Sequence, residues 1–269
     1  MDVSCIFPIR VDTAAHHPHA TGIPSKAMLN NSQIYHQTMH DTKARGIDGQ
    51  QFRFLSPWIP ADGVKCTVGS VSLNLPVMLK AKAKAVTALT GGVEYLLKKN
   101  KVDYIKGTAS FASATDLDIS LIDGGSTQIS AKNIIIATGS EVTPFPGVEI
   151  DEVQIVSSTG ALDLQKVPEK LVIIGAGVIG LEMGSVWARL GAKVEVVEYM
   201  NIIGGTGMDG GIAKAFQKIL TKQGFKFSLN TKVLGVEKKD GKVTVNVEGA
   251  KDGKKSTVRL SFSHFPNAD

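Results

Sequence analysis

The stretch LVIIGAGVIGLEMGSVWARLGAKVEVVE, residues 171–198, decides the fold of this chain. It opens with a continuous apolar run at 171–174, as buried parallel strands do, and passes through a glycine turn into a helical pattern at 178–190. A second apolar strand is expected at 194–197 and ends at Glu198. Strand, turn, helix and strand in this order predict a βαβ unit, and therefore an α/β fold.

The turn inside this stretch reads Gly175-Ala176-Gly177-Val178-Ile179-Gly180, which is G-x-G-x-x-G. Alone the motif is weak, but here it lies between a strand and a helix, the context that dinucleotide binding requires. The first glycine makes the tight turn, the second lets a pyrophosphate approach the backbone, and the third lets helix and strand pack closely. The amides and dipole at the helix start favour the negative pyrophosphate.

Glu198 lies 18 residues after Gly180 and indicates which dinucleotide is bound. A carboxylate at the end of the second strand accepts hydrogen bonds from both ribose hydroxyls and repels a 2′-phosphate. NAD is therefore favoured over NADP. The competing interpretation is an ordinary glycine-rich turn followed by a surface glutamate, and the complete order of elements favours the NAD site.

A second turn of small residues, Ala137-Thr138-Gly139-Ser140, follows an apolar run at 133–137 for which we predict a buried strand. Small residues at the carboxyl end of a strand suit a second nucleotide. A plain turn fits the spacing equally well.

Helices are also expected elsewhere, at 25–43, 76–99 and 212–223. The first places four apolar residues on one face: Met28, Ile34, Tyr35 and Met39. The second carries an apolar stripe: Val86, Leu89, Val93, Leu96 and Leu97.

Short strands are expected at 103–106, 118–122 and 127–130, and Asp123-Gly124-Gly125 predicts a hairpin between the last two. Asp240-Gly241 predicts another between 233–238 and 243–248.

The composition, 43% hydrophobic and 20% charged over 269 residues, is that of a globular chain of one large or two ordinary domains. The net charge is +5, but the lysines are scattered, and the cluster Lys80-Lys82-Lys84 is interpreted as a solvated helix face. No nucleic-acid motif accompanies them, so anionic small ligands are favoured over nucleic acid.

Metal and membrane sites are not predicted. The two cysteines, Cys5 and Cys66, are far apart, and His36 and His40, although spaced for one helix face, have no third ligand. No apolar run approaches the roughly 20 residues of a membrane span. Residues 1–21 read as a poor signal or transit peptide, so no targeting signal is readable.

Several stretches together are similar to one family. They are GIPSKA from Gly22, KGTAS from Lys106, IIIATGSEVTPFPG from Ile134, STGAL from Ser158, GAGVIGLEMGSVWARLG from Gly175 and GGTGMD from Gly204. The combination resembles the dihydrolipoyl dehydrogenases, the flavoprotein components of the 2-oxo acid dehydrogenase complexes. That family passes electrons from dihydrolipoamide to a cysteine pair, then to FAD, then to NAD.

The resemblance implies an oxidoreductase with FAD and NAD, a homodimer bound to a 2-oxo acid dehydrogenase complex, and the mitochondrial matrix as its location. On the FAD side it implies a lysine beside the flavin, a backbone contact and the small-residue turn: Lys26, Gly107, Thr138, Gly139 and Ser140. On the NAD side it implies the loop, the ribose acid and a contact near the adenine: Gly175–Gly180, Glu182, Glu198 and Val233.

The departures from the family concern catalysis. A family cysteine immediately precedes the IPSK sequence and its partner lies five residues earlier, but Gly22 and His17 occupy these positions here. The family's N-terminal FAD motif, its interface domain and its catalytic His-Glu pair are not found either. We therefore expect no catalytic residue in this chain and no turnover by it. The alternatives to an enzyme are an NAD-binding module and a non-functional fragment.

The resemblance divides the chain into a partial FAD-binding domain, 22–151, with a helical arm and a small β-meander, and a Rossmann-like NAD-binding domain, 152–260, without its last strand. Residues 1–21, 51–68 and 261–269 resemble nothing in the family. We interpret these three stretches as unspliced or misjoined coding sequence.

Overall fold

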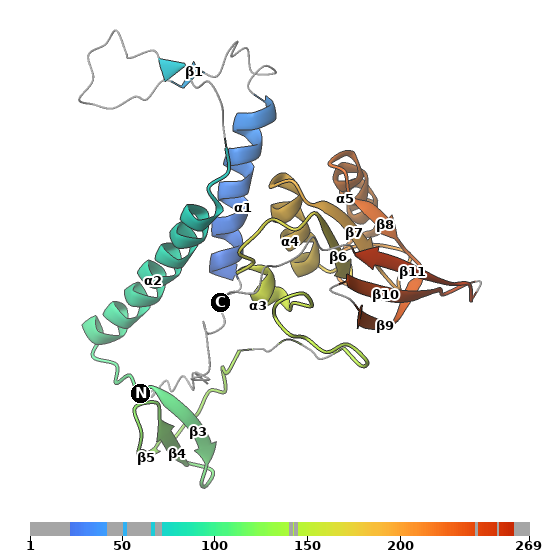
Figure 1. The fold of residues 1–269 in the computed structure, drawn as a ribbon. Coiled ribbons are helices and arrows are strands. Elements are labelled where there is room, and N and C mark those ends of the chain that lie inside the picture. The colour runs from blue at the N-terminus through green and yellow to red at the C-terminus, as the bar shows by residue number, and fades with distance from the viewer. Residues whose placement is uncertain are drawn as a thin grey trace. The chain divides into compact units, whose positions relative to one another are not determined.

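A computed structural model of the chain describes residues 22–41, 51–52, 66–67, 72–139, 142, 145–239, 242–251 and 253–260. Its described residues divide into two compact units, one with residues 22–23 and 83–143 and the other with residues 24–82 and 144–260 (Figure 1). Each unit is described by itself. Predictions on residues 1–21, on most of 51–68 and on 261–269 lie outside the described residues.

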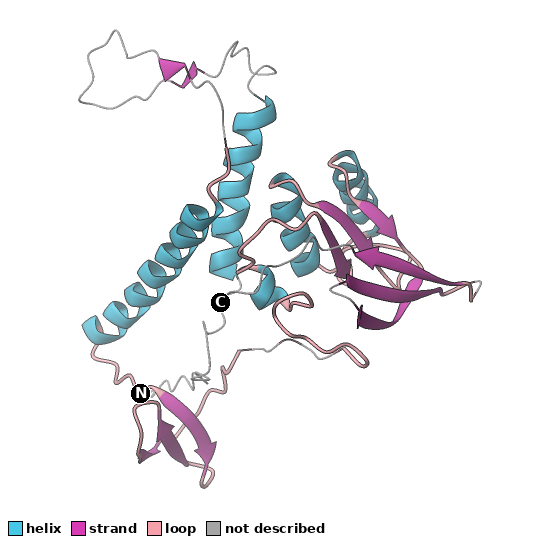
Figure 2. Ribbon diagram, viewed as in Figure 1, coloured by secondary structure: helices cyan, strands magenta, loops and turns pink. Residues whose placement is uncertain are grey.

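A parallel sheet forms the centre of the second unit. Its strands are β6 (Lys170–Ile174), β7 (Lys193–Val197) and β8 (Lys226–Ser228), in the order β6-β7-β8. Helix α4 (Val178–Arg189) connects β6 to β7, and α5 (Gly210–Lys222) connects β7 to β8. The predicted βαβ unit is confirmed, since β6 and β7 pair in parallel along their whole lengths (Figure 2).

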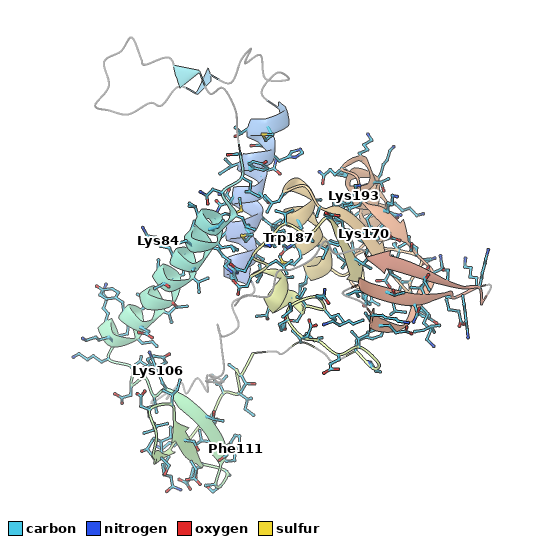
Figure 3. The ribbon with its side chains drawn as sticks, viewed as in Figure 1. Lys84, Lys106, Phe111, Lys170, Trp187 and Lys193 are labelled. Carbon is cyan, nitrogen blue, oxygen red and sulfur yellow. The ribbon has the colours of Figure 1, made fainter. Side chains whose placement is uncertain are left out.

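The two faces of this sheet are buried against different layers, because side chains alternate along a strand. Leu171 and Ile173 of β6 pack in the core shared with the helices, whereas Val172 packs on the opposite side. On the helix side, Trp187 of α4 is fully buried and its Nε1 donates to the carbonyl of Ala161 at 2.9 Å (Figure 3). Burial on both faces explains the uninterrupted apolar run of β6.

An antiparallel sheet packs on the other face. Its strands are β9 (Thr231–Lys239), β10 (Lys242–Gly249) and β11 (Lys255–Leu260), with β10 in the middle. Its inward valines pack with Val197 of β7: Val233, Val243, Val245 and Val247. The predicted pairing of β9 with β10 is confirmed, while its turn, Asp240-Gly241, lies outside the described residues. The third strand, β11, was not predicted.

Helix α1 (Gly22–His36) continues as a π-helical turn at Gln37–Asp41 and contributes Met28 to the helix-side core. Helix α2 (Leu75–Lys99) contributes Leu75, and a short helix α3 (Ser158–Ala161) is capped by the Ser157 hydroxyl. The two-residue strands β1 (Gln51–Phe52) and β2 (Cys66–Thr67) pair with each other.

The unit of residues 83–143 contains the rest of α2 and an antiparallel sheet of β3 (Gly107–Phe111), β4 (Asp116–Leu121) and β5 (Ser126–Ser130). Its buried hydrophobic residues are Leu117 and Ile119 of β4 and Ala131, which follows β5. The hairpin predicted at Asp123-Gly124-Gly125 is confirmed, and both glycines have positive φ.

Two sequence predictions are wrong in this unit. Residues 133–137 form no strand, and Ile135 and Ile136 are 55% and 70% exposed, because no described strand lies beside them to pair with their backbone. Residues 103–106 are irregular, and the strand begins at Gly107 instead. The helix predicted at 76–99 is confirmed as α2, and its apolar stripe is largely uncovered: Leu89, Val93 and Leu96 are each more than half exposed.

The first predicted helix is also partly wrong. It begins at Gly22 and its α-helical part ends at His36, seven residues before the expected end at 43. Of the four apolar residues expected on one face, Met28 is buried but Ile34 is 55% exposed.

Candidate dinucleotide-binding site

The glycine loop between β6 and α4 contains three glycines with three different surroundings. Gly175 has φ +96°, a left-handed conformation that favours glycine. A Cβ on Gly180 would lie 2.8 Å from the carbonyl oxygen of Gly175 and 2.9 Å from Cγ2 of Ile173. A Cβ on Gly177 would meet nothing within 4 Å. The loop is therefore tightly turned at Gly175, closely packed at Gly180 and open at Gly177.

The start of α4 offers backbone donors beside that opening. Gly177 caps the helix without a side-chain hydrogen bond, and the first intrahelical donor is the amide of Leu181, 3.0 Å from the carbonyl of Gly177. The amides of Val178, Ile179 and Gly180 belong to the first turn, where a helix has no carbonyl to receive them. They lie at the positive end of the helix dipole, which suits an anionic group such as a pyrophosphate.

Glu198 follows β7 and reaches back to the glycine loop. Its Oε2 accepts a hydrogen bond from the amide of Ala176 at 2.6 Å, and its Oε1 accepts one from the amide of Met200 at 2.8 Å. A carboxylate has about four lone-pair positions, so two bonds leave acceptor capacity for further hydroxyl groups. The structure thus brings the predicted ribose acid to the predicted pyrophosphate loop.

Two further predicted residues form an ion pair between helices. Lys26 on α1 pairs with Glu182 on α4, although 156 residues separate them in sequence. Lys26 was expected beside the flavin and Glu182 in the NAD loop, so this pair joins one residue from each predicted set. Sequence patterns gave no sign of the pairing.

The remaining FAD-side residues belong to the other unit. Gly107 lies in β3, where a Cβ would be 2.4 Å from the carbonyl oxygen of Ser120, so strand packing alone accounts for this glycine. Thr138 and Gly139 lie in an irregular, exposed segment, and Ser140 is outside the described residues. Within either unit, the described residues form no backbone cradle for a flavin like that of the glycine loop.

Val233, expected near the adenine, lies in β9 with its side chain 8% exposed among the valines of the antiparallel sheet. That side chain packs in the core of the sheet and is not available to a ligand. Any contact from Val233 to a ligand would have to come from its backbone.

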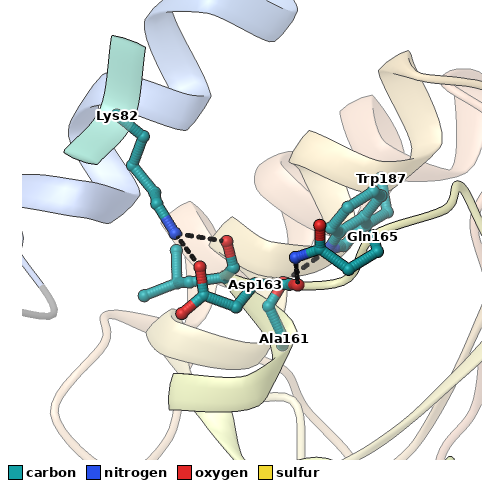
Figure 4. Close-up of polar contacts among 6 residues, drawn as sticks. Lys82, Ala161, Asp163, Gln165 and Trp187 are labelled. Carbon is teal, nitrogen blue, oxygen red and sulfur yellow. Dashed lines mark hydrogen bonds and ion pairs between the residues drawn. The ribbon is translucent and has the colours of Figure 1, made fainter. Parts of the chain in front are cut away.

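Lys82 was expected on a solvated face, and this prediction is wrong. The residue is 5% exposed; its Nζ donates to the carbonyl of Leu162 at 2.9 Å and pairs with Asp163 (Figure 4). Trp187 donates to the carbonyl of Ala161, the last residue of α3, directly before this turn. Because buried charges are normally paired, we interpret Lys82 as a structural tie between α2 and this turn.

A separate hollow of about 500 Å³ is lined by residues of β9, β10 and β11 together with Gly147, and by no residue of the glycine loop; its lining includes Glu237, Asn246 and Thr257. Among the described residues, no group of three His, Cys, Asp or Glu side chains is placed to hold a metal ion. The described helices include none that is long and apolar enough to cross a membrane.

Comparison with known proteins identifies the family. The family model "Pyridine nucleotide-disulphide oxidoreductase" matches residues 2–262. This range runs through 2–21 and 51–68. The expectation that these stretches lie outside the family stays a prediction, and so do the predicted domain boundaries.

Relatives of high identity are dihydrolipoyl dehydrogenases. The chain is 54% identical over 236 residues to the dihydrolipoamide dehydrogenase of Chaetomium thermophilum, covering 88% of this chain and 43% of that protein. It is 54% identical to the mitochondrial dihydrolipoyl dehydrogenase of Caenorhabditis elegans and 51% identical to that of Homo sapiens, covering 44% and 43% of them. The chain thus spans less than half the length of these relatives.

Solved structures share the fold. LpdA from Mycobacterium tuberculosis superposes with a TM-score of 0.69 at 20% identity, covering 88% of this chain and 47% of LpdA. The HOCl-induced flavoprotein disulfide reductase RclA from Escherichia coli gives 0.61 at 23% identity, covering 89% and 44%. With its Rossmann-type α/β fold, this chain belongs to the pyridine nucleotide-disulphide oxidoreductase family, and its sequence is similar to those of the dihydrolipoyl dehydrogenases.

Proposed function

We propose that this chain binds NAD at the glycine loop, as the NAD-binding part of a dihydrolipoyl dehydrogenase. The observation that carries the proposal is the Glu198 carboxylate, hydrogen-bonded to the loop amide of Ala176. The pyrophosphate would lie against the open backbone at Gly177 and the first amides of α4, and the adenosine ribose would lie against Glu198.

Glu198 also supports NAD rather than NADP. Its remaining acceptor capacity suits the 2′- and 3′-hydroxyls of the ribose, whereas a 2′-phosphate would place a second negative charge against the carboxylate. A residue that accepts the phosphate would have to be cationic, and Tyr199 and Met200 follow Glu198 instead.

In the whole protein, the proposed reaction is NAD-dependent oxidation of protein-bound dihydrolipoamide through FAD. FAD would supply the electron relay between thiols and NAD. The support is the identity to proteins with that name. Assembly as a homodimer in a 2-oxo acid dehydrogenase complex is proposed on the same basis, and so is the mitochondrial matrix, from the names of the relatives.

A second proposal concerns the chain as its sequence stands: it binds NAD without turning over lipoamide. Gly22 and His17 occupy the positions of the cysteine pair, and disulfide exchange needs a thiolate as its nucleophile. The expected result is no NAD-linked oxidation of dihydrolipoamide by the purified chain and no yellow flavin colour. Turnover above a no-enzyme control would refute this second proposal.

Titration calorimetry with NAD and NADP tests the first proposal. We expect NAD to bind more tightly. Glu198→Ala should weaken NAD binding by about 10- to 100-fold, because hydrogen bonds to a charged acceptor are lost, and should lower the preference over NADP. Glu237→Gln, in the antiparallel sheet, is the control and should bind NAD as the unchanged chain does.

Three outcomes would contradict the proposal. Tighter binding of NADP would refute the role of Glu198. An unchanged NAD to NADP ratio in Glu198→Ala would do the same. The absence of NAD binding by a folded chain, judged by its melting curve, would favour the non-functional fragment.

A further inference from the structure

Exposed apolar side chains gather around the glycine loop. They stand at the carboxyl ends of β6 and β7 or in the first turn of α4, and they are Ile174, Val178, Ile179, Tyr199 and Met200, from 37% to 62% exposed. Apolar side chains beside a few polar donors and acceptors are typical of a small-molecule site. The pyrophosphate and ribose interactions proposed above do not require this apolar surface.

Tyr199 is the most exposed of the five, at 62%, and stands at a corner held by hydrogen bonds. On one side of it, the Glu198 amide donates to Ser228 and the Glu198 carbonyl accepts from Thr231, each at 2.9 Å. On the other side, the Met200 carbonyl accepts from Asn230 at 3.0 Å. The Met200 amide closes the corner by donating to the Glu198 carboxylate at 2.8 Å.

This corner joins the end of β7 to the start of β9. Thr231 is the first residue of β9, and Val233 lies two residues further along the strand. Because the Val233 side chain is buried in the sheet core, it cannot form part of a ligand-binding surface beside the corner. Tyr199 carries an exposed aromatic ring on backbone that these hydrogen bonds already fix, so ordering it on a ligand costs side-chain freedom but no further backbone entropy.

We propose that Tyr199 stacks on the adenine ring of the dinucleotide, an inference that rests on the proposed NAD site. Glu198 would hold the ribose of the adenosine half, and the base is attached to that same sugar. The residue next to Glu198 is therefore within reach of the base. A tyrosine ring offers adenine a flat face that excludes water and stacks with its π-system.

The experiment compares Tyr199→Ala, Tyr199→Phe and Tyr95→Ala by calorimetric titration with NAD and with ADP-ribose. Base–aromatic stacking predicts that Tyr199→Ala weakens both ligands by about 5- to 150-fold and by similar factors, since both contain the adenosine half. Tyr199→Phe keeps the ring and should stay within about 2-fold. Tyr95 on α2 is 63% exposed, so Tyr95→Ala removes an equally exposed tyrosine and should change neither affinity.

The outcomes separate this inference from the proposed function. If the unchanged chain binds NAD and Tyr199→Ala binds it equally well, the stacking role is refuted and the NAD site stands. A loss for NAD without a loss for ADP-ribose would place the ring at the nicotinamide and overturn the adenine assignment. No NAD binding by the unchanged chain would refute both. Melting curves of each variant exclude misfolding as the cause of a loss.

Discussion

Two glycines three residues apart in the same loop should respond to the same substitution in opposite ways. At Gly177 the backbone is at φ −70° and ψ 168°, which alanine adopts freely, and an added Cβ meets nothing within 4 Å. The change in unfolding free energy should therefore stay within about 1 kcal/mol, the size of ordinary glycine-to-alanine effects at compatible positions. The methyl group would, however, fill the space through which a pyrophosphate approaches the backbone.

At Gly180 the same methyl group would meet the protein itself. Its Cβ would lie 2.8 Å from the Gly175 carbonyl and 2.9 Å from Ile173, so helix and strand must separate. Overpacking of this kind costs about 1–3 kcal/mol. At about 2–4 °C per kcal/mol for a chain of this size, the melting temperature of Gly180→Ala should fall by roughly 2–12 °C.

The assay measures melting by circular dichroism and NAD affinity by calorimetry for both variants. Gly177→Ala should melt close to the unchanged chain and yet bind NAD about 10- to 150-fold more weakly, because charge-assisted bonds to the pyrophosphate are lost. Gly180→Ala should show the fall in melting temperature. The reasoning is refuted if Gly177→Ala binds NAD normally, or if it melts as low as Gly180→Ala.

Two further predictions concern stability. Lys82→Ala removes the donor to the Leu162 carbonyl and should lower the free energy of unfolding by about 1–3 kcal/mol in a urea titration. Lys84 is exposed on the same helix, so Lys84→Ala should leave that free energy unchanged. Equal effects of the two substitutions would contradict the structural role of Lys82. Burial alone would raise the pKa of Asp151, but Lys238 and three backbone amides outweigh it and hold that pKa well below its usual range. The stabilising contribution of ionised Asp151 is therefore present above the unfolded pKa of about 3.9 and is lost as the pH falls below that value. Asp151→Asn should flatten the fall in unfolding free energy at acid pH. An unchanged dependence of that free energy on pH would count against the ion pair.

The βαβ unit could be predicted because its signals are local. The apolar run of β6, the turn at Gly175–Gly180 and the amphipathic start of α4 are contiguous, and each constrains the next through backbone geometry. The segment at 133–137 has an equally apolar sequence and is no strand. A strand needs a neighbour to pair with, and the pattern of one segment does not say whether that neighbour is present.

Contacts between distant segments could not be predicted from sequence patterns, because the partners of a side chain lie on another part of the chain. Lys82 has exposed lysines two residues away on either side and the same chemistry, yet it alone is buried, because the turn at Leu162 and Asp163 presents acceptors to its position on α2.

Glu198 shows how such contacts refine a correct expectation. Its position at the end of β7 predicted a ligand for ribose, but its bonds to Ala176 and Met200 also fasten the loop and the corner that carries Tyr199. One carboxylate therefore links the proposed pyrophosphate, ribose and adenine contacts. Glu198→Gln removes the charge and keeps only one acceptor oxygen, so it should lose one of the two backbone bonds and most of the selectivity against NADP, measured by titration with both dinucleotides.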